Sequence, residues 1–486
     1  MDIITAEGID LTLGIGLLIY FFLILVIGVY CARYMKSIDD FLLGGRKLGP
    51  WVTAVSERAS GESAWFLLGL PGTAYVVGFR EFWTVIGIAL GILASWTFIA
   101  LPLRSATAKM GALTLPDYFE ARFGDKSRIL RLVSMLIIVF FYTLYVGAQF
   151  VGGGKILNAT FGINSVTGMF IGAGLVIFYT FMGGFLAVAW TDLIQGLLMA
   201  FTAIALPVLG IIKLGGFSNF TSQVATIRGP EFLSMSGGQV GKAFVFGVMF
   251  GSMAWGFGYL GQPHLLARYM AIRSTHEIRK ARIIAMIWVL IAYWGAAFIG
   301  LIGLGLLGSG LSDAEQVMPL VAKSLLPSWL AGIIIAGAMA AMMSTADSQL
   351  IVATSSLAED LYARILKPGS SQKSLIIVSR IATVVVALIA LFIAMTNEEL
   401  IYDLVAYAWT GLGSSFGPPL LLALLWKRVS KWGALAGMLG GTISTIIWQN
   451  VQLLNNFLDK KISTFIISLF LVFIVSLLTK PVQNRD

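Results

Sequence analysis

Runs of apolar residues long enough to cross a lipid bilayer recur from one end of this 486-residue chain to the other. A membrane-spanning helix needs about 20 mostly apolar residues. Because backbone groups in hydrocarbon must hydrogen-bond within the segment, such runs fold as helices and not as open strands. Only 12% of the residues are charged, whereas about 25% are charged in an average soluble domain. The sequence therefore predicts an all-α polytopic membrane protein.

The apolar pattern predicts about 13 transmembrane helices. Their expected ranges are 11–30, 48–71, 83–103, 128–150, 165–187, 190–212, 241–262, 282–307, 327–350, 374–395, 401–425, 433–450 and 463–479. No Pro- or Ser-rich linker separates them, so we expect one membrane domain over residues 1–486.

Basic residues gather after the first, third, seventh and eleventh predicted helices. With 13 spans these loops share one side, which the positive-inside rule assigns to the cytoplasm. We therefore expect a multi-pass protein of the cell membrane with its N-terminus outside, its C-terminus inside and the polar loop 213–240 outside. The same pattern accounts for the net charge of +9 without a nucleic-acid partner.

Several other classes of function are disfavoured by the sequence. No arrangement typical of a catalytic triad, a zinc protease or a phosphate-binding loop is found, so we do not expect an enzyme. The glycines of 303–308 lie in an apolar helix without a preceding strand, which excludes a dinucleotide site. His264 and His276 fall in one predicted basic loop without further ligands, and Cys31 is the one cysteine. No obligate protein partner is expected, and no output domain accompanies the helices, which disfavours a membrane sensor.

Three charged residues interrupt the second predicted helix. Glu57, Arg58 and Glu62 lie within the segment 56–65, next to Gly61. Each charge at mid-membrane costs roughly 2.5–3.5 kcal/mol unless it is paired or faces water. Arg58 and Glu62 are spaced i, i+4 and could neutralise each other. Alternatively, Arg58 binds a substrate carboxylate while Glu62 or Glu57 binds a cation or proton.

A second interrupted helix lies five helices further on. Residues 251–263 contain four glycines and end in Pro263. Broken helices at corresponding positions indicate two inverted repeats with a binding site between them. We expect a first repeat at about 48–212 and a second at about 241–425, with flanking helices 11–30, 433–450 and 463–479. The alternative is that the glycines only serve tight packing.

Polar side chains also mark one face of the ninth predicted helix. Ala341, Ser344, Thr345 and Ser348 follow i, i+3, i+4, i+7 spacing, and Asp347 borders that face. Oxygen ligands of this kind suit a hard cation. Alternatively, the hydroxyls bond back to their own helix.

Asp192 lies where the fifth and sixth predicted helices meet. Asp is a frequent N-cap residue, and we expect it to cap the sixth helix. A role as a cation ligand is the alternative.

Six stretches in order resemble the solute:sodium symporter family, and the likeness runs from the first helix to about residue 432. The stretches are 39–50 (DDFLLGGRKLGP), 69–72 (GLPG), 113–119 (LTLPDYF), 183–188 (GGFLAV), 258–264 (GYLGQPH) and 343–345 (MST). The resemblance implies a core of five plus five helices in inverted repeats, with the second and seventh helices broken.

The resemblance also implies a sodium site between the second and ninth helices. Its ligands would be the carbonyls of Ala59, Glu62 and Ala341 and the hydroxyls of Ser344 and Thr345. A further cation or proton site would involve Asp192, Asp347 and Ser348. Substrate contacts are implied at Ser63, Ala64, Trp65, Tyr145, Trp255, Tyr259 and Pro263, in addition to Arg58.

The resemblance implies a cation-coupled symporter that imports a small amino acid, with proline and Na⁺ as the first expectations. Family members that carry proline have an aspartate at the position of Gly61 and an uncharged residue at that of Glu62. Coupling to protons through Glu62 or Asp347, an organic-acid substrate, and a transport-incompetent sensor remain as alternatives.

Overall fold

The computed structural model describes residues 11–33, 38–396, 401–451, 453–454 and 458–481. These residues are almost entirely helical, and an isolated bridge between Leu48 and Ile272 is the only β-structure among them. The all-α class expected from the sequence is therefore confirmed.

The helices of the first half include both halves of the first interrupted segment. They are α1 (Leu11–Ala32), α2 (Ile38–Leu43), α3 (Pro50–Gly61), the π-helical turn Trp65–Gly69, α4 (Leu70–Val77), α5 (Phe82–Ala94), the π-helical turn Ser95–Ile99, α6 (Ala100–Met110), α7 (Leu115–Phe123), α8 (Ile129–Phe161), α9 (Ser165–Lys213) and α10 (Phe217–Arg228).

The second half has the same character. Its helices are the π-helical segment Ala243–Phe250, α11 (Gly251–Met253), the 3-10 segment Ala254–Leu260, α12 (Pro263–Ala271), α13 (Ile278–Leu307), α14 (Val317–Leu325), α15 (Ser328–Ser355), the π-helical segment Ser356–Leu366, α16 (Gln372–Thr396), α17 (Ile401–Leu425), α18 (Lys431–Asn450) and α20 (Lys460–Leu478).

Eleven helical stretches within the described residues are long and apolar enough to cross a membrane. The predicted spans 48–71 and 433–450 have no stretch of their own among them. The first of these is divided between α3 and the following turn, and the second corresponds to α18, which is a 20-residue helix of lower hydropathy. The expected number of 13 spans is not tested by this comparison.

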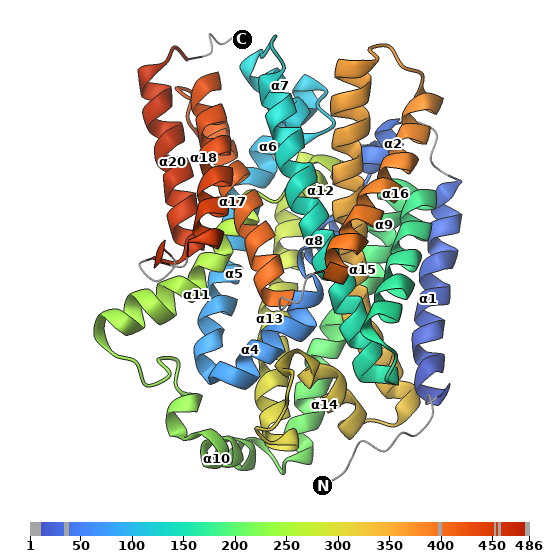
Figure 1. The fold of residues 1–486 in the computed structure, drawn as a ribbon, viewed down its shortest axis with the longest axis vertical. Helices are drawn as coiled ribbons and strands as arrows, with labels where there is room; N and C mark the ends of the chain where they lie inside the picture. The colour runs from blue at the N-terminus through green and yellow to red at the C-terminus, as the bar shows by residue number, and fades with distance from the viewer. Residues whose placement is uncertain (1–10, 34–37, 397–400, 452, 455–457, 482–486) are drawn as a thin grey trace.

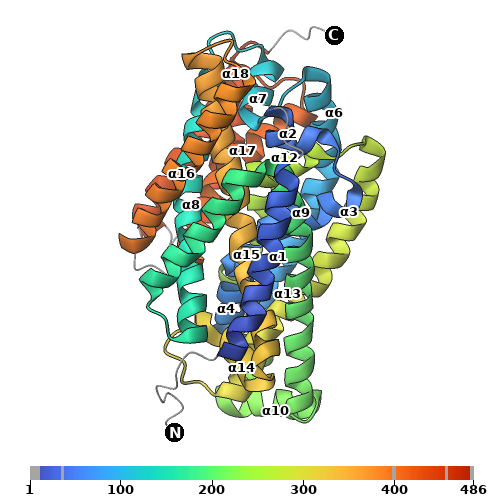
Figure 2. The same ribbon diagram turned by 90° about the vertical axis from the view of Figure 1, so that its right-hand side faces the viewer.

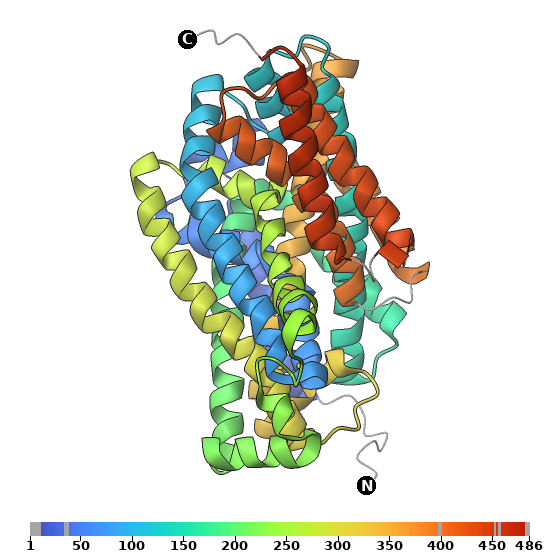
Figure 3. The same cartoon turned by 90° about the vertical axis from the view of Figure 1, so that its left-hand side faces the viewer.

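The helix α15 forms the centre of the bundle. It packs against α1, α8, α9 and α3, and nearly all of its side chains are buried. Helices α18 and α20 pack on each other and on α17 at one flank, and the helix 243–253 projects from the bundle beside them (Figures 1 and 3). The polar face of the ninth predicted helix therefore lies inside the protein and away from lipid.

The loops with basic residues lie at one end of the molecule. Helices α2, α6, α7 and the start of α18 lie at the end of the molecule where α20 ends, and α10 and α14 lie at the opposite end, where α1 begins (Figures 1 and 2). This arrangement agrees with the sequence-based grouping of basic loops on one side.

Two sequence-based boundaries are wrong. The fifth and sixth predicted helices do not meet near residue 190, because the break in α9 is at Gly184, which has φ 55° and ψ −164°. Only glycine adopts this conformation readily. The segment after the seventh predicted helix is not a loop, because α12 continues to Ala271. The loop 213–240, which the sequence predicts to be external, contains helix α10.

Candidate functional site

Helix α3 stops in the middle of the bundle. Glu62 has φ −104° and ψ 33°, and the chain becomes helical again at Ala64 and Trp65. The amide of Ala64 donates to Gln149 Oε1 of α8 at 2.8 Å instead of to its own helix. Residues 52–70 are all buried. The break therefore exposes backbone groups of α3 to other helices and not to water or lipid.

The second break brings the 3-10 segment Ala254–Leu260 against α17. A Cβ atom on Gly258 would lie 1.8 Å from Trp409 Nε1, and one on Gly261 would lie 2.4 Å from the amide nitrogen of Gly417. These two glycines are required by close approach, so the tight-packing interpretation of the glycines is correct at these positions. Glycines of this interrupted helix therefore also allow it to pack closely against α17.

Two hydroxyls of α15 contact the carbonyl oxygens at the end of α3. Ser344 Oγ donates to Ala59 O at 2.9 Å and to Ala341 O at 3.2 Å. Thr345 Oγ1 donates to Ser60 O at 2.9 Å. These groups are fully buried and are oxygen ligands, which suits Na⁺ because hard cations prefer oxygen. The structure thus brings Ala59, Ala341, Ser344 and Thr345 together, whereas it gives no contact for the carbonyl of Glu62.

Asp192 does not cap a helix, contrary to our expectation. It lies inside α9, eight residues after the break at Gly184, and is fully buried. Its Oδ2 accepts hydrogen bonds from Ser56 at 2.7 Å and Ser60 at 2.9 Å, and its distance to Arg268 Nη2 is 3.0 Å. The helix that follows Gly184 has already begun at residue 192, so Asp192 has no helix N-terminus to cap, and Arg268 provides the countercharge for its carboxylate.

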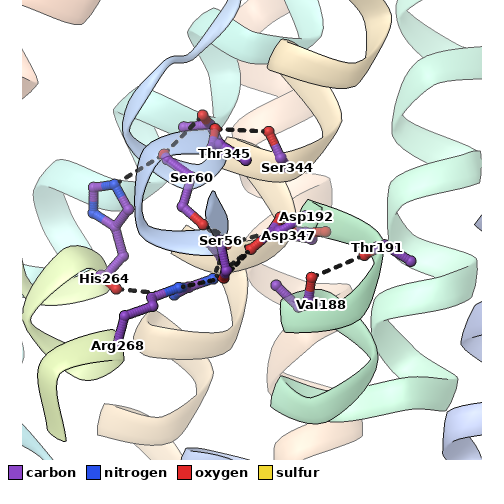
Figure 4. A network of polar contacts seen from close by, with 12 residues as sticks. Ser56, Ser60, Val188, Thr191, Asp192, His264, Arg268, Ser344, Thr345 and Asp347 are labelled. Atoms are coloured by element: carbon purple, nitrogen blue, oxygen red, sulfur yellow. Dashed lines mark hydrogen bonds and ion pairs between the residues drawn. The ribbon is translucent and has the colours of Figure 1, made fainter. Parts of the chain in front are cut away.

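Asp347, which is labelled in Figure 4 beside Asp192, and Ser348 complete this second group of polar side chains. Ser348 Oγ lies 2.9 Å from Ser60 Oγ and 3.0 Å from Asp347 Oδ1. The other oxygen of Asp347 accepts from Tyr179 at 2.7 Å. Asp192 Oδ1 is buried without a hydrogen-bond partner. The structure therefore unites Asp192, Asp347 and Ser348, and it adds Arg268 to them.

We call Glu57, Arg58 and Glu62 the charged cluster. Arg58 donates through Nε and Nη2 to Glu57, and its Nη1 lies 3.0 Å from Glu62 Oε1. All three side chains are buried. The i, i+4 pairing of Arg58 with Glu62, one of the two alternatives left open by the sequence, is present, and the bidentate pairing of Arg58 with Glu57 was not predicted.

Aromatic rings adjoin the charged cluster. Trp65 stacks on Trp255 with ring centroids 4.6 Å apart, and Tyr259 meets Trp409 edge to face at 4.6 Å. Tyr145 lies edge to face against Trp409 at 6.4 Å. Four expected substrate residues, Trp65, Tyr145, Trp255 and Tyr259, thus belong to one aromatic group, which we call the aromatic wall.

The remaining expected substrate residues lie next to the helix breaks. Ser63 and Ala64 form the break itself, and Ser63 Oγ accepts from the amide of Trp65 at 3.2 Å. Pro263 begins α12 and lines a cavity of about 20 Å³ that reaches Thr114 and Ser355, towards α7. The break and the aromatic wall are therefore adjacent, and Pro263 faces a different space.

Sequence reasoning missed four buried polar residues, namely Gln149, His264, Arg268 and Tyr293. His264 and Arg268 were assigned to a basic loop, but both are fully buried in α12. His264 Nε2 lies 3.1 Å from Ser60 O, and its Nδ1 lies 2.7 Å from Tyr142 Oη. His264 and Arg268 are spaced i, i+4 directly after Pro263, and proline is a favoured first residue of a helix. This spacing was the signal from which a helix could have been predicted here.

A protein-family model described as the sodium:solute symporter family matches residues 41–441. The chain is 43% identical over 439 residues to the sodium/proline symporter of Escherichia coli K12, covering 89% of this chain and 86% of that protein. It is 41% identical over 460 residues to the high-affinity proline transporter PutP of Bacillus subtilis 168, covering 94% and 96%.

Solved structures share the fold. A Na⁺-coupled sialic acid symporter in a substrate-bound outward-open state matches with a TM-score of 0.79 at 22% identity, over 97% of this chain and 99% of that one. MhsT in complex with L-phenylalanine matches with a TM-score of 0.56 at 17% identity, over 88% and 97%. At these identities the similarity shows the fold alone.

Proposed function

Because the chain belongs to the sodium:solute symporter family, we propose that it imports proline together with Na⁺ across the cell membrane. Relatives at 41–43% identity over most of the chain are named as proline transporters. The resemblance inferred from the motifs is thereby confirmed. The substrate and the coupling ion are our proposal for this chain.

The observation that carries the proposal is the contact between α15 and the end of α3. Ser344 and Thr345 direct their hydroxyls at the carbonyls of Ala59 and Ser60. We propose that Na⁺ binds here, with Ala341 and the carbonyl of Glu62 completing its ligands. The ion would hold the two helices together and favour the state that captures substrate. Substrate and ion then raise each other's affinity, because linkage is reciprocal.

Substrate would bind at the aromatic wall and the break at Ser63 and Ala64. A small apolar ring such as that of proline suits aromatic side chains, and backbone groups at an interrupted helix suit its carboxylate or ammonium. Asp192, Asp347 and Ser348 are the candidates for a second cation or proton site.

Topology and repeats complete the proposal. We propose an external N-terminus and a cytoplasmic C-terminus, because the basic loops lie at the end of the molecule where α20 ends and opposite the start of α1. The halves 48–212 and 241–425 would be the two inverted repeats, since each contains one of the broken helices.

The test is proline uptake by the purified chain in proteoliposomes with an imposed sodium gradient. We expect uptake in the wild type and its loss, by a factor of about 100 or more at low sodium, in the double variant Ser344→Ala, Thr345→Ala. A variant with Ser324→Ala, a partly buried hydroxyl in α14, is the control. Uptake whose sodium dependence is unaltered in the double variant would refute the proposed ion site.

A further inference from the structure

The second half of α15 and the π-helical segment that follows it carry a row of buried polar side chains. Both polar atoms of the Gln349 amide, Ser356 Oγ and Asp360 Oδ2 have no hydrogen-bond partner among the described residues. The three side chains are at most 1% exposed. Buried polar atoms are nearly always bonded to protein or to water. We call these three residues the polar row, and their oxygens are free to bind a ligand.

The polar row shares one helix face with a proposed ligand of the sodium ion. Gln349 and Ser356 follow Thr345 at i+4 and i+11. Val352 lies between them at i+7. Residues at these spacings lie above one another on one face of a helix. Asp360 follows four residues after Ser356, in the π-helical segment. The row therefore begins one turn from the proposed sodium site and continues to the end of this helix.

A small cavity adjoins the same face. It has a volume of about 20 Å³, and Val352, Ser356 and Thr114 are among the residues that line it. About 10–15 Å³ of such space holds one water molecule, so this cavity has room for a water molecule or a small ion. Thr114 Oγ1 donates to Asp360 Oδ1 at 2.9 Å. The cavity thus lies next to the carboxylate that ends the polar row.

The far end of the polar row is close to the protein surface. Arg131 of α8 pairs with Asp360 Oδ1. It also pairs with Asp117 and Glu120 of α7, whose side chains are 12% and 24% exposed. Helix α7 lies at the end of the molecule where α20 ends (Figure 1). The part-exposed carboxylates offset the charge of Arg131, so this end of the row does not repel a cation.

The neighbouring face of α15 is closed to a cation by a buried guanidinium. Arg268 Nη2 lies 3.0 Å from Asp192 Oδ2 and 2.5 Å from Ser348 Oγ, and the side chain is fully buried. Like charges repel strongly where little water screens them. Within the described part of the chain, the cationic side chain bonded to the polar row is Arg131, at its last member. A cation that leaves the sodium site therefore meets less repulsion along the polar row.

We infer that the polar row is the release route by which the coupling cation passes from Thr345 to the proposed cytoplasmic surface. Gln349 is the first residue to receive the ion. The inference rests on the proposed function and adds to it the path by which the ion leaves. Na⁺ needs oxygen ligands at each step, because a bare charge in the protein interior is costly. The amide, hydroxyl and carboxylate oxygens of the row supply them in sequence.

The first test is Gln349→Leu, which removes the first oxygen and keeps a side chain of similar size. The described residues give this amide no partner to lose, so the variant should melt at the wild-type temperature or above it. Net proline uptake into proteoliposomes under a sodium gradient requires release of the ion, and we expect its rate to fall about tenfold. Proline exchange with saturating sodium on both sides does not require that release, so its rate should stay within about twofold.

Thr160→Val is the matched control for Gln349→Leu. It removes another buried hydroxyl that lacks a partner within the described residues, at the opposite end of α8 from Arg131, and both rates should equal those of the wild type. Unaltered net uptake in Gln349→Leu, or a fall in exchange as large as the fall in net uptake, would overturn the inference. Absence of proline uptake by the wild type would instead overturn the proposed function.

The second test labels the polar row and remains informative if Gln349→Leu does not fold. Cys31 is the one cysteine, so Ser356→Cys in a Cys31→Ser background carries a single thiol. A small cationic thiosulfonate that does not cross membranes is added to inside-out vesicles, which expose the proposed cytoplasmic side. It should modify the thiol in the absence of sodium, and saturating sodium should slow the reaction at least tenfold, because the ion favours the state that captures substrate.

Ser379→Cys in the same background is the control for the labelling. Ser379 is also a buried serine whose hydroxyl has no partner among the described residues, but it lies in α16. We expect no modification of this variant with or without sodium. Failure to modify Ser356→Cys under either condition, or equal modification of the two variants, would overturn the inference.

Discussion

Two buried groups of similar composition stabilise the centre of this protein in different ways. The charged cluster has two glutamates and one arginine within six consecutive residues around the end of α3. The other group has two aspartates and one arginine, and these come from α9, α15 and α12, with two serines of α3 between them. The three charges of the first group are close in sequence, and each glutamate has further donors on other helical segments. The second joins four helices, so its integrity depends on how they are arranged.

The comparison predicts different consequences when the arginine is removed. Removing one partner of a buried ion pair typically costs about 3–5 kcal/mol, because the other charge is left unpaired. The loss of stability in each variant then depends on how many other hydrogen-bond donors the carboxylates keep. More remaining donors give a smaller loss.

The largest effect is expected for Arg268→Met. Asp192 keeps only the two serine hydroxyls, and its Oδ1 already lacks a partner. We expect a loss of about 3–5 kcal/mol in stability, observed as a lower melting temperature in detergent. Sodium should restore part of it, because a ligand that binds only the folded state stabilises it. If Arg268→Met melted at the same temperature as the wild type, the second group would not depend on its arginine as we expect.

A smaller effect is expected for Arg58→Met. Glu57 retains Trp96 and Tyr269 as donors, and Glu62 retains Tyr293. We expect a loss of about 2–3 kcal/mol, measured under the same conditions as for Arg268→Met. Greater destabilisation by Arg58→Met than by Arg268→Met would reverse the comparison.

The smallest effect is expected for Tyr269→Phe. The hydroxyl donates to Glu57 Oε1, and Ser95 is its other neighbour. One hydrogen bond to a charged group contributes about 1.5–3 kcal/mol, and the remaining donors on Glu57 favour the low end. Tyr179→Phe, which removes the single tyrosine donor from Asp347, should lower the melting temperature more. If Tyr269→Phe and Tyr179→Phe lowered the melting temperature equally, the additional hydrogen-bond donors around Glu57 would contribute nothing to the stability of the Tyr269 variant.

Local features of the site could be predicted from the sequence. The interruption of α3 and the pairing of Arg58 with Glu62 depend on residues a few positions apart, and both are confirmed. The hydroxyl face of α15 was also predicted from spacing, and Ser344 and Thr345 do meet the end of α3.

Long-range features could not be predicted. Asp192 looked like an N-cap, and His264 and Arg268 looked like loop residues, because polar residues beside apolar runs usually lie at helix ends. Their burial depends on α12 packing against α3 and α6. The i, i+4 spacing after Pro263 indicates a helix there but not this packing. The same holds for Tyr293, which is one aromatic residue among many in α13.

The sequence by itself determined that this chain is a bundle of membrane helices with two interruptions, because bilayer thickness and backbone hydrogen bonding leave no other fold for such apolar runs. It also determined the family, through motifs in a fixed order. Only the tertiary structure decided which charges face each other. A buried carboxylate is stable only with partners, and for Asp192 and Glu62 some of those partners come from helices 76 or more residues away.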